Sequence, residues 1–137
     1  MDLHYIKNNL EKINEQIGSA CVAGNREKSD VTLLPVTKKQ PIEKLQYLYE
    51  LGERSFGENR VQELNEKAAK LPEDIEWHLI GGLQSNKVRA ALKSASFIHS
   101  VDSLKLIKRI DLIAEEDNKH PSISVSYTHL TLPTKRI

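Results

Sequence analysis

The sequence predicts an α/β fold in which a leading helix precedes repeated strand–helix units and the strands form one parallel sheet. Short extended stretches recur about every 21 to 23 residues, and an amphipathic stretch follows each of them; they begin near Val31, Arg54, Ile75 and Ser96. Parallel strands need a helical crossover of this length between them, and such crossovers are right-handed. A chain of 137 residues with 39% apolar content is enough for one domain with a core.

The leading helix is predicted from apolar residues that recur at spacings of three and four, which places them on one helix face: Leu3, Ile6, Leu10, Ile13, Ile17 and Ala20. Gly24 suits the end of this helix. The only cysteine, Cys21, lies on the same apolar stripe. We therefore interpret it as a small buried side chain and not as a reactive thiol.

Each later extended stretch is followed by a helical pattern. The inward positions of the first, second and fourth of these helices are Ile42, Leu45 and Leu48; Val61, Leu64 and Ala68; and Leu104, Ile107, Ile110 and Ala114. The third helix, predicted over residues 84 to 95, is more basic but has no interleaved aromatic residues, which favours a solvated face over an RNA surface. A fifth strand is predicted to begin near Ser122.

The charge balance argues against several classes of partner. Lysine plus arginine total 20 and aspartate plus glutamate total 19, so overall charge attracts neither nucleic acid nor an anionic membrane. No apolar run approaches the roughly 18 residues that span a bilayer, and the N-terminus does not resemble a signal peptide. We expect a cytoplasmic, monomeric protein that binds no nucleic acid, membrane or metal.

Polar residues collect where the predicted strands end. Lys38 follows the first strand, Asn59 ends the second in RSFGEN, a glycine pair ends the third in EWHLIGG, and Ser100 ends the fourth in SFIHSVD. In α/β folds the carboxyl ends of parallel strands meet at one rim, where ligands bind. The sequence therefore predicts a binding site at this rim.

Lys38 is the reactive candidate at the rim. Side chains alternate along a strand, so Leu34, Val36 and Lys38 are expected on one side and Thr37 on the other. An apolar wall disfavours an ammonium and lowers a lysine pKa, which suits a nucleophilic amine. The alternative is that Lys38 is a solvated lysine at a strand end. Pro35 interrupts this predicted strand and is tolerated only where its nitrogen needs no hydrogen-bond partner.

The other rim residues also have structural interpretations. Asn59 can be the N-cap of the helix NRVQELNEKA, a contact to a bound cofactor, or both. His78 lies in an apolar strand, where a hydrogen-bonded core histidine is the default. The glycine pair Gly81-Gly82 precedes Ser85 and Asn86 at a helix start but matches neither a P-loop nor a dinucleotide fingerprint.

Four segments in this order, PVTKKQP, FGENRVQE, WHLIGGLQSNK and IHSVDSLKL, resemble the pyridoxal-phosphate homeostasis proteins over roughly residues 3 to 119. These are single-domain barrels similar to the N-terminal domain of alanine racemase. The resemblance implies a TIM-type barrel that holds pyridoxal 5′-phosphate as an internal aldimine on the lysine after the first strand, here Lys38. Asn59, His78 and Lys87 match motif positions of the family, and with Ser100 at the rim they complete the candidate cofactor-binding set.

The function implied by the resemblance is that of a cofactor carrier. We expect it to buffer pyridoxal 5′-phosphate and to deliver it to acceptor apo-enzymes. Racemisation needs an acid/base on each face of the adduct, and the racemases take the second from another domain. The alternatives are a pyridoxal-phosphate-dependent racemase or decarboxylase of the same barrel type, and an interaction module without cofactor.

The chain is short for this family. A TIM barrel needs eight strands and about 250 residues. We therefore expect the N-terminal half of a barrel over residues 1 to 124 and weak cofactor binding or none by this piece alone, because the family binds the phosphate near its last strands. Residues 125 to 137 are expected to be non-native, because VSYTHLTLPT is what one frame of a common transposon library adapter encodes.

Overall fold

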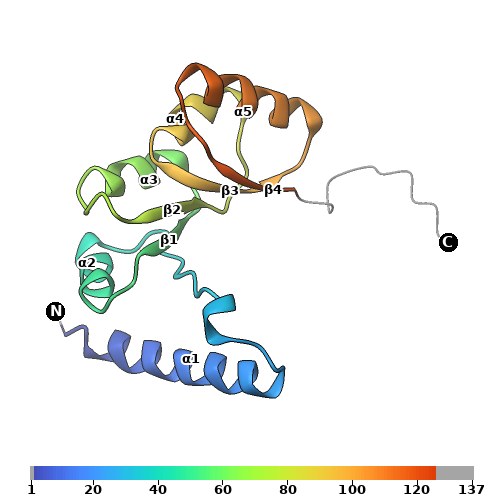
Figure 1. The fold of residues 1–137 in the computed structure, drawn as a ribbon. Helices are drawn as coiled ribbons and strands as arrows, with labels where there is room; N and C mark the ends of the chain where they lie inside the picture. Colours follow the sequence, from blue (N-terminus) through green and yellow to red (C-terminus); the bar gives the residue numbers. More distant parts are fainter. Residues whose placement is uncertain (1, 126–137) are drawn as a thin grey trace.

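The computed structural model describes residues 2 to 125 and contains one parallel sheet of four strands (Figure 1). The strands are β1 (Ser55–Glu58), β2 (Glu76–Leu79), β3 (Ala95–Val101) and β4 (Ser122–Val125), in the order β1-β2-β3-β4. Neighbouring strands are therefore consecutive in the chain, and each pair is parallel. The predicted α/β class, the parallel sheet and the strand near Ser122 are confirmed. The expected non-native tail lies outside the described residues, apart from Val125 in β4.

The helices alternate with the strands as expected. They are α1 (His4–Ala23), α2 (Ile42–Glu50), α3 (Val61–Ala68), α4 (Val88–Leu92) and α5 (Leu104–Glu116), with short 3₁₀ helices η1 (Lys28–Asp30) and η2 (Ser85–Lys87). The predicted helix over residues 84 to 95 is wrong in extent, because only α4 is α-helical there. Ser85 and Asn86 are weak helix formers that compete for backbone hydrogen bonds, which fits the 3₁₀ turn before α4. None of the described helices is both long and apolar enough to cross a bilayer.

The first predicted strand is reduced to one parallel bridge between Val36 and Gly57 of β1. The Gly57 N–H donates to the Pro35 carbonyl at 2.8 Å, and the Thr37 N–H donates to the Gly57 carbonyl at 2.9 Å. Pro35 has no N–H to extend this pairing on its own side. The prediction of a full strand from Val31 is thus wrong, but its last residues do lie beside β1.

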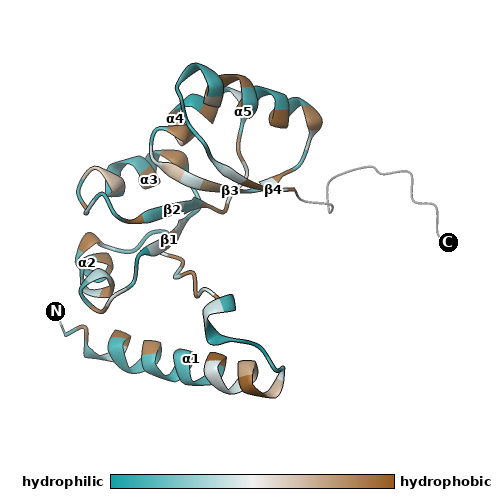
Figure 2. Cartoon of the chain, viewed as in Figure 1, coloured by the Kyte–Doolittle hydropathy of each residue, from teal (hydrophilic) through white to brown (hydrophobic). Residues whose placement is uncertain are grey.

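The core lies on one face of the sheet. Phe56, Trp77 and Leu79 of β1 and β2 pack with Leu45 of α2 and Leu64 of α3. A second cluster joins β3 to α4 and α5, with Ile98, Val101, Val88, Leu92, Leu106, Ile110 and Ile113. Figure 2 shows that the helices carry both hydrophilic and hydrophobic residues, as amphipathic helices do. Burial of this apolar surface holds α2 to α5 on the sheet.

The opposite side of the sheet is less covered, and we call it the open face. It carries Val36, which is 49% exposed, and the half-buried rings of His78, Phe97 and His99. Thr37, the neighbour of Val36, is buried on the helix side, so the predicted alternation of side chains is confirmed at these two residues. Cys21 is buried, as predicted, and α1 ends at Ala23 before Gly24.

Candidate functional site

Lys38 lies in a tight turn directly after the bridge to β1. The Gln40 N–H donates to the Thr37 carbonyl at 3.1 Å and closes this turn. Lys39 has a φ of +59°, a left-handed conformation that is uncommon for a residue with a side chain. The Lys38 side chain is exposed, and no helix or strand encloses it in an apolar wall within residues 2 to 125.

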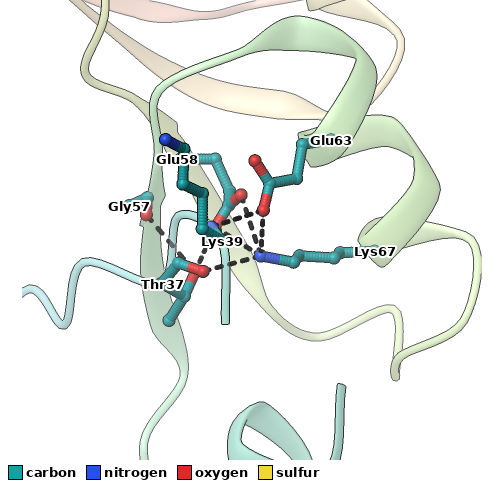
Figure 3. A network of polar contacts seen from close by, with 6 residues as sticks. All are labelled: Thr37, Lys39, Gly57, Glu58, Glu63 and Lys67. Carbon is teal, nitrogen blue, oxygen red and sulfur yellow. Dashed lines mark hydrogen bonds and ion pairs between the residues drawn. The ribbon is translucent and has the colours of Figure 1, made fainter. Parts of the chain in front are cut away.

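A buried polar network stands behind this turn (Figure 3). The Lys67 ammonium of α3 donates to the Thr37 carbonyl at 2.6 Å and to the two Glu58 carboxylate oxygens at 3.0 and 3.1 Å. It also donates to Glu63 at 2.8 Å, and the Thr37 hydroxyl donates to Glu58. Glu63 in turn accepts from the Lys39 N–H at 2.6 Å. Four side chains thus fix the backbone on both sides of Lys38.

The pKa values of the two carboxyl groups in this network are shifted in opposite directions. Burial raises the pKa of Glu58, and the hydrogen bonds from Thr37 and Lys67 act against that rise. The hydrogen bond from Lys67 lowers the pKa of Glu63, which is only partly buried. Lys67 therefore keeps one carboxylate partner, Glu63, even when Glu58 is protonated.

Asn59 does not cap α3, so the N-cap interpretation is wrong. Arg60 occupies the N-cap position, and no side-chain hydrogen bond caps this helix. Asn59 instead packs on Gly81, where an added Cβ would lie 2.2 Å from the Asn59 carbonyl oxygen and 2.8 Å from its Oδ1. The Gly81 position thus has to be a glycine because the Asn59 backbone passes directly over it.

His78 belongs to a ring cluster on the open face. Its Nδ1 lies 3.1 Å from Nε2 of His99, and its ring stacks on Phe97 with centroids 4.2 Å apart and planes 2° apart. Its buried Nε2 has no hydrogen-bond partner among the described residues. Burial lowers the pKa of His78, the nearby His99 lowers it further, and Glu76 acts against both. His78 is therefore held toward its neutral form, which is able to accept or donate one hydrogen bond at the free nitrogen.

Lys87 and Ser100 complete the predicted set. Lys87 ends η2, is exposed, and lines with Asn59 a cleft of about 620 Å³ between α3 and α4. Ser100 is exposed near the end of β3, where the pairing with β4 is irregular, and its φ is +58°. A left-handed backbone conformation is strained for a residue other than glycine, and such residues cluster at functional sites.

Four of the predicted residues lie on a sheet strand or in the connection that follows one: Asn59, His78, Lys87 and Ser100. Lys38 instead follows the isolated bridge to β1. Within residues 2 to 125, no side-chain hydrogen bond joins any two of the five. The sequence reasoning missed Lys67, Phe97 and His99. Signals for them exist: Lys67 stands three residues after the inward Leu64, and alternation in SFIHSV puts Phe97 and His99 on one strand face.

Two features of these residues bear on the chemistry that is possible here. A primary amine on a fixed turn is a nucleophile toward aldehydes once it loses its proton. The rings of His78 and Phe97, which stack on each other, form an aromatic patch on the open face, and the buried Nε2 of His78 has no hydrogen-bond partner among the described residues.

Comparison with known proteins identifies curated relatives that share one protein name. No family model matches the chain. The pyridoxal phosphate homeostasis protein of Synechocystis sp. is 45% identical over 93 residues, which are 66% of this chain and 43% of that protein. The one from Haemophilus influenzae is 38% identical over 109 residues, or 77% of this chain and 46% of that protein. The chain therefore spans about half the length of the curated relatives it matches.

Solved structures give the same result. PipY of Synechococcus elongatus with pyridoxal phosphate bound superposes with a TM-score of 0.70 at 41% identity, covering 88% of this chain and 56% of that one. An unknown protein from Bifidobacterium adolescentis superposes with a TM-score of 0.82 at 30% identity, covering 90% of this chain and 56% of that one. The match thus extends over most of this chain in both sequence and fold.

Proposed function

Since this chain belongs to the pyridoxal phosphate homeostasis protein family, over the part of those proteins that it spans, we propose that Lys38 binds pyridoxal 5′-phosphate as a Schiff base. The protein then buffers the cofactor and delivers it to acceptor apo-enzymes. The observation that carries the proposal is the fixed turn that presents the exposed Lys38 in the segment PVTKKQP. The bound cofactor in PipY, at 41% identity, supports it.

The sheet is proposed to be the first half of a TIM-type barrel, within residues 1 to 124. Four parallel strands in chain order, with their main core on one face, support this arrangement. The open face would then line the barrel interior. The monomeric state and the cytoplasmic location stay predictions.

The residues around the rim fit this cofactor. The aromatic patch of His78 and Phe97 suits contact with a flat pyridine ring, and the unpaired Nε2 of His78 suits a polar ring substituent. Asn59, Lys87 and Ser100 are proposed as further cofactor contacts at the rim. When bound, the cofactor supplies an aldehyde carbon with which the neutral Lys38 amine condenses, with loss of one water.

A carrier is favoured over an enzyme because racemisation requires an acid/base group on each side of the planar adduct. Lys38 can serve one side. Among residues 2 to 125, every tyrosine lies in α1 or α2 and none on a strand of the sheet. The racemases bring their tyrosine from another domain. Turnover of D- or L-alanine that depends on Lys38 would favour a racemase instead.

The test is borohydride trapping with pyridoxal 5′-phosphate, followed by peptide mass spectrometry. It uses the product of the complete gene and, side by side, the 137-residue chain. Two matched variants, Lys38→Arg and Lys39→Arg, each remove one primary amine and keep its charge. The proposal expects a pyridoxyl adduct on Lys38 that Lys38→Arg abolishes and Lys39→Arg retains. Absence of this adduct from the complete protein would overturn the proposal and favour an interaction module.

A further inference from the structure

Lys38 stands between two backbone anchors that come from α3. On one side the Thr37 carbonyl accepts from the Lys67 ammonium at 2.6 Å. On the other side the Lys39 N–H donates to the Glu63 carboxylate at 2.6 Å. The two anchoring side chains are themselves paired at 2.8 Å, one helical turn apart. A single helix therefore clamps the peptide units on either side of Lys38 (Figure 3).

The clamp holds an unfavourable backbone conformation. Lys39 has a φ of +59°, where a Cβ crowds the following carbonyl. Glycine or asparagine would adopt this conformation more easily, yet the chain has lysine there. The charge-assisted hydrogen bond from the Lys39 N–H to Glu63 is the contact that offsets this strain.

The clamp is also built from buried charge, which is costly. The side chains of Lys67 and Glu58 are 7% and 0% exposed. Such a pair seldom stabilises a fold more than well-packed apolar residues of similar volume do. General stability therefore explains the network poorly, whereas strained backbone and buried charged groups are typical of functional sites.

We infer that Glu63 and Lys67 are positioning residues for Lys38, with Glu58 and Thr37 holding Lys67 in place. The inference rests on the proposed function of Lys38. The clamp fixes the Lys38 backbone before ligand arrives, so capture of an aldehyde does not require ordering of the turn. Glu63 and Lys67 act through the backbone and touch neither the amine nor its ligand.

The experiment compares Glu63→Ala with Glu66→Ala, a change of the same type one turn along α3. Glu66 is exposed, and among the described residues its side chain has a hydrogen bond only from Gln62. The first readout is amide hydrogen exchange at Lys39, measured without cofactor. Loss of a hydrogen bond to a charged group predicts exchange faster by about tenfold or more in Glu63→Ala. Glu66→Ala is expected to match the wild type.

The second readout is the rate at which pyridoxal 5′-phosphate labels Lys38 under borohydride trapping. Glu63→Ala is expected to slow this labelling about tenfold, because the turn must then be ordered during capture. Labelling of Lys93, an exposed lysine at the end of α4 and away from this turn, is expected to stay unchanged in the same samples. The double variant Glu58→Gln/Lys67→Met removes the buried charge pair and leaves only the partly exposed Glu63 without its cation, and it is expected to show both effects.

The outcomes separate the two proposals. Wild-type exchange at Lys39 and wild-type labelling of Lys38 in Glu63→Ala and the double variant would overturn the clamp and leave the proposed function intact. Faster exchange with unchanged labelling would mean a purely structural turn and would also overturn it. Faster exchange in a protein whose Lys38 is never labelled, even in the wild type, would support the clamp as a backbone device and overturn the proposed function alone.

Discussion

The Lys67 ammonium lies 3.0 Å from the Glu58 carboxylate, and the protein backbone and side chains around them leave almost no solvent contact. The pair joins α3 to β1 directly behind the turn that carries Lys38. The cost of desolvating two charges offsets most of their attraction. Removal of one charge is therefore expected to destabilise the fold more than removal of both.

This asymmetry is measurable. Lys67→Met leaves the Glu58 carboxylate buried without its cation and is expected to lower the free energy of unfolding by about 3 to 5 kcal/mol at neutral pH. The double variant Glu58→Gln/Lys67→Met removes both charges and is expected to lose clearly less. Urea unfolding of the three proteins measures both differences. A double variant as unstable as Lys67→Met would contradict the account.

The Asn59–Gly81 contact predicts that two neighbouring glycines, Gly81 and Gly82, differ in how well they tolerate replacement by alanine. Gly81→Ala would bring its Cβ to 2.2 Å from the Asn59 carbonyl oxygen, so the backbone after β1 must shift. Overpacking of this kind costs about 1 to 3 kcal/mol. Gly82→Ala is the control, because nothing lies within 4 Å of its added Cβ. Thermal unfolding of both variants checks this, and equal stabilities would show that the chain passes Gly81 less closely.

The start of α5 gives a third prediction. Ser103 is the N-cap of this helix, and its hydroxyl accepts from the Leu106 N–H at 3.1 Å. Ser103→Ala is expected to lower the free energy of unfolding by about 1 kcal/mol. Ser85→Ala, in the short η2 where no side-chain cap forms, is expected to change it by less than about 0.5 kcal/mol. Urea unfolding distinguishes the two, and a Ser103→Ala variant as stable as Ser85→Ala would argue against the cap.

Much of the fold could be predicted from the sequence, because the two periods in it are strong. The spacing of apolar residues by three and four predicted the helices, as at Leu104, Ile107 and Ile110. The recurrence of extended stretches every 21 to 23 residues predicted the parallel sheet. The first strand could not be predicted correctly, since alternation in VTLLPVTK indicates a strand while Pro35 removes a hydrogen-bond donor. Local periodicity does not report whether a partner strand is there to be paired.

The candidate site was harder to predict than the fold. Lys38 was found from its place after an extended stretch and from a motif, and its role is still a proposal. The network behind it was missed, because Glu58 and Lys67 are nine residues apart in sequence and reach Thr37 only through the packing of α3 on β1. Likewise the His78–His99 contact depends on the register between β2 and β3, which no single segment encodes.

His78 gives the last prediction, because burial lowers its pKa below the ordinary 6.5. Between the folded and the unfolded pKa, the unfolded chain binds more protons than the folded one. The contribution of neutral His78 to stability is therefore complete above about pH 6.5 and declines as the pH falls through the folded pKa.

His78→Phe keeps a flat ring against Phe97 but cannot titrate, so its free energy of unfolding should fall less between pH 7 and pH 5 than that of the wild type. Urea unfolding across this pH range measures the slopes, and equal slopes for His78→Phe and the wild type would mean that His78 titrates alike in the folded and unfolded chain.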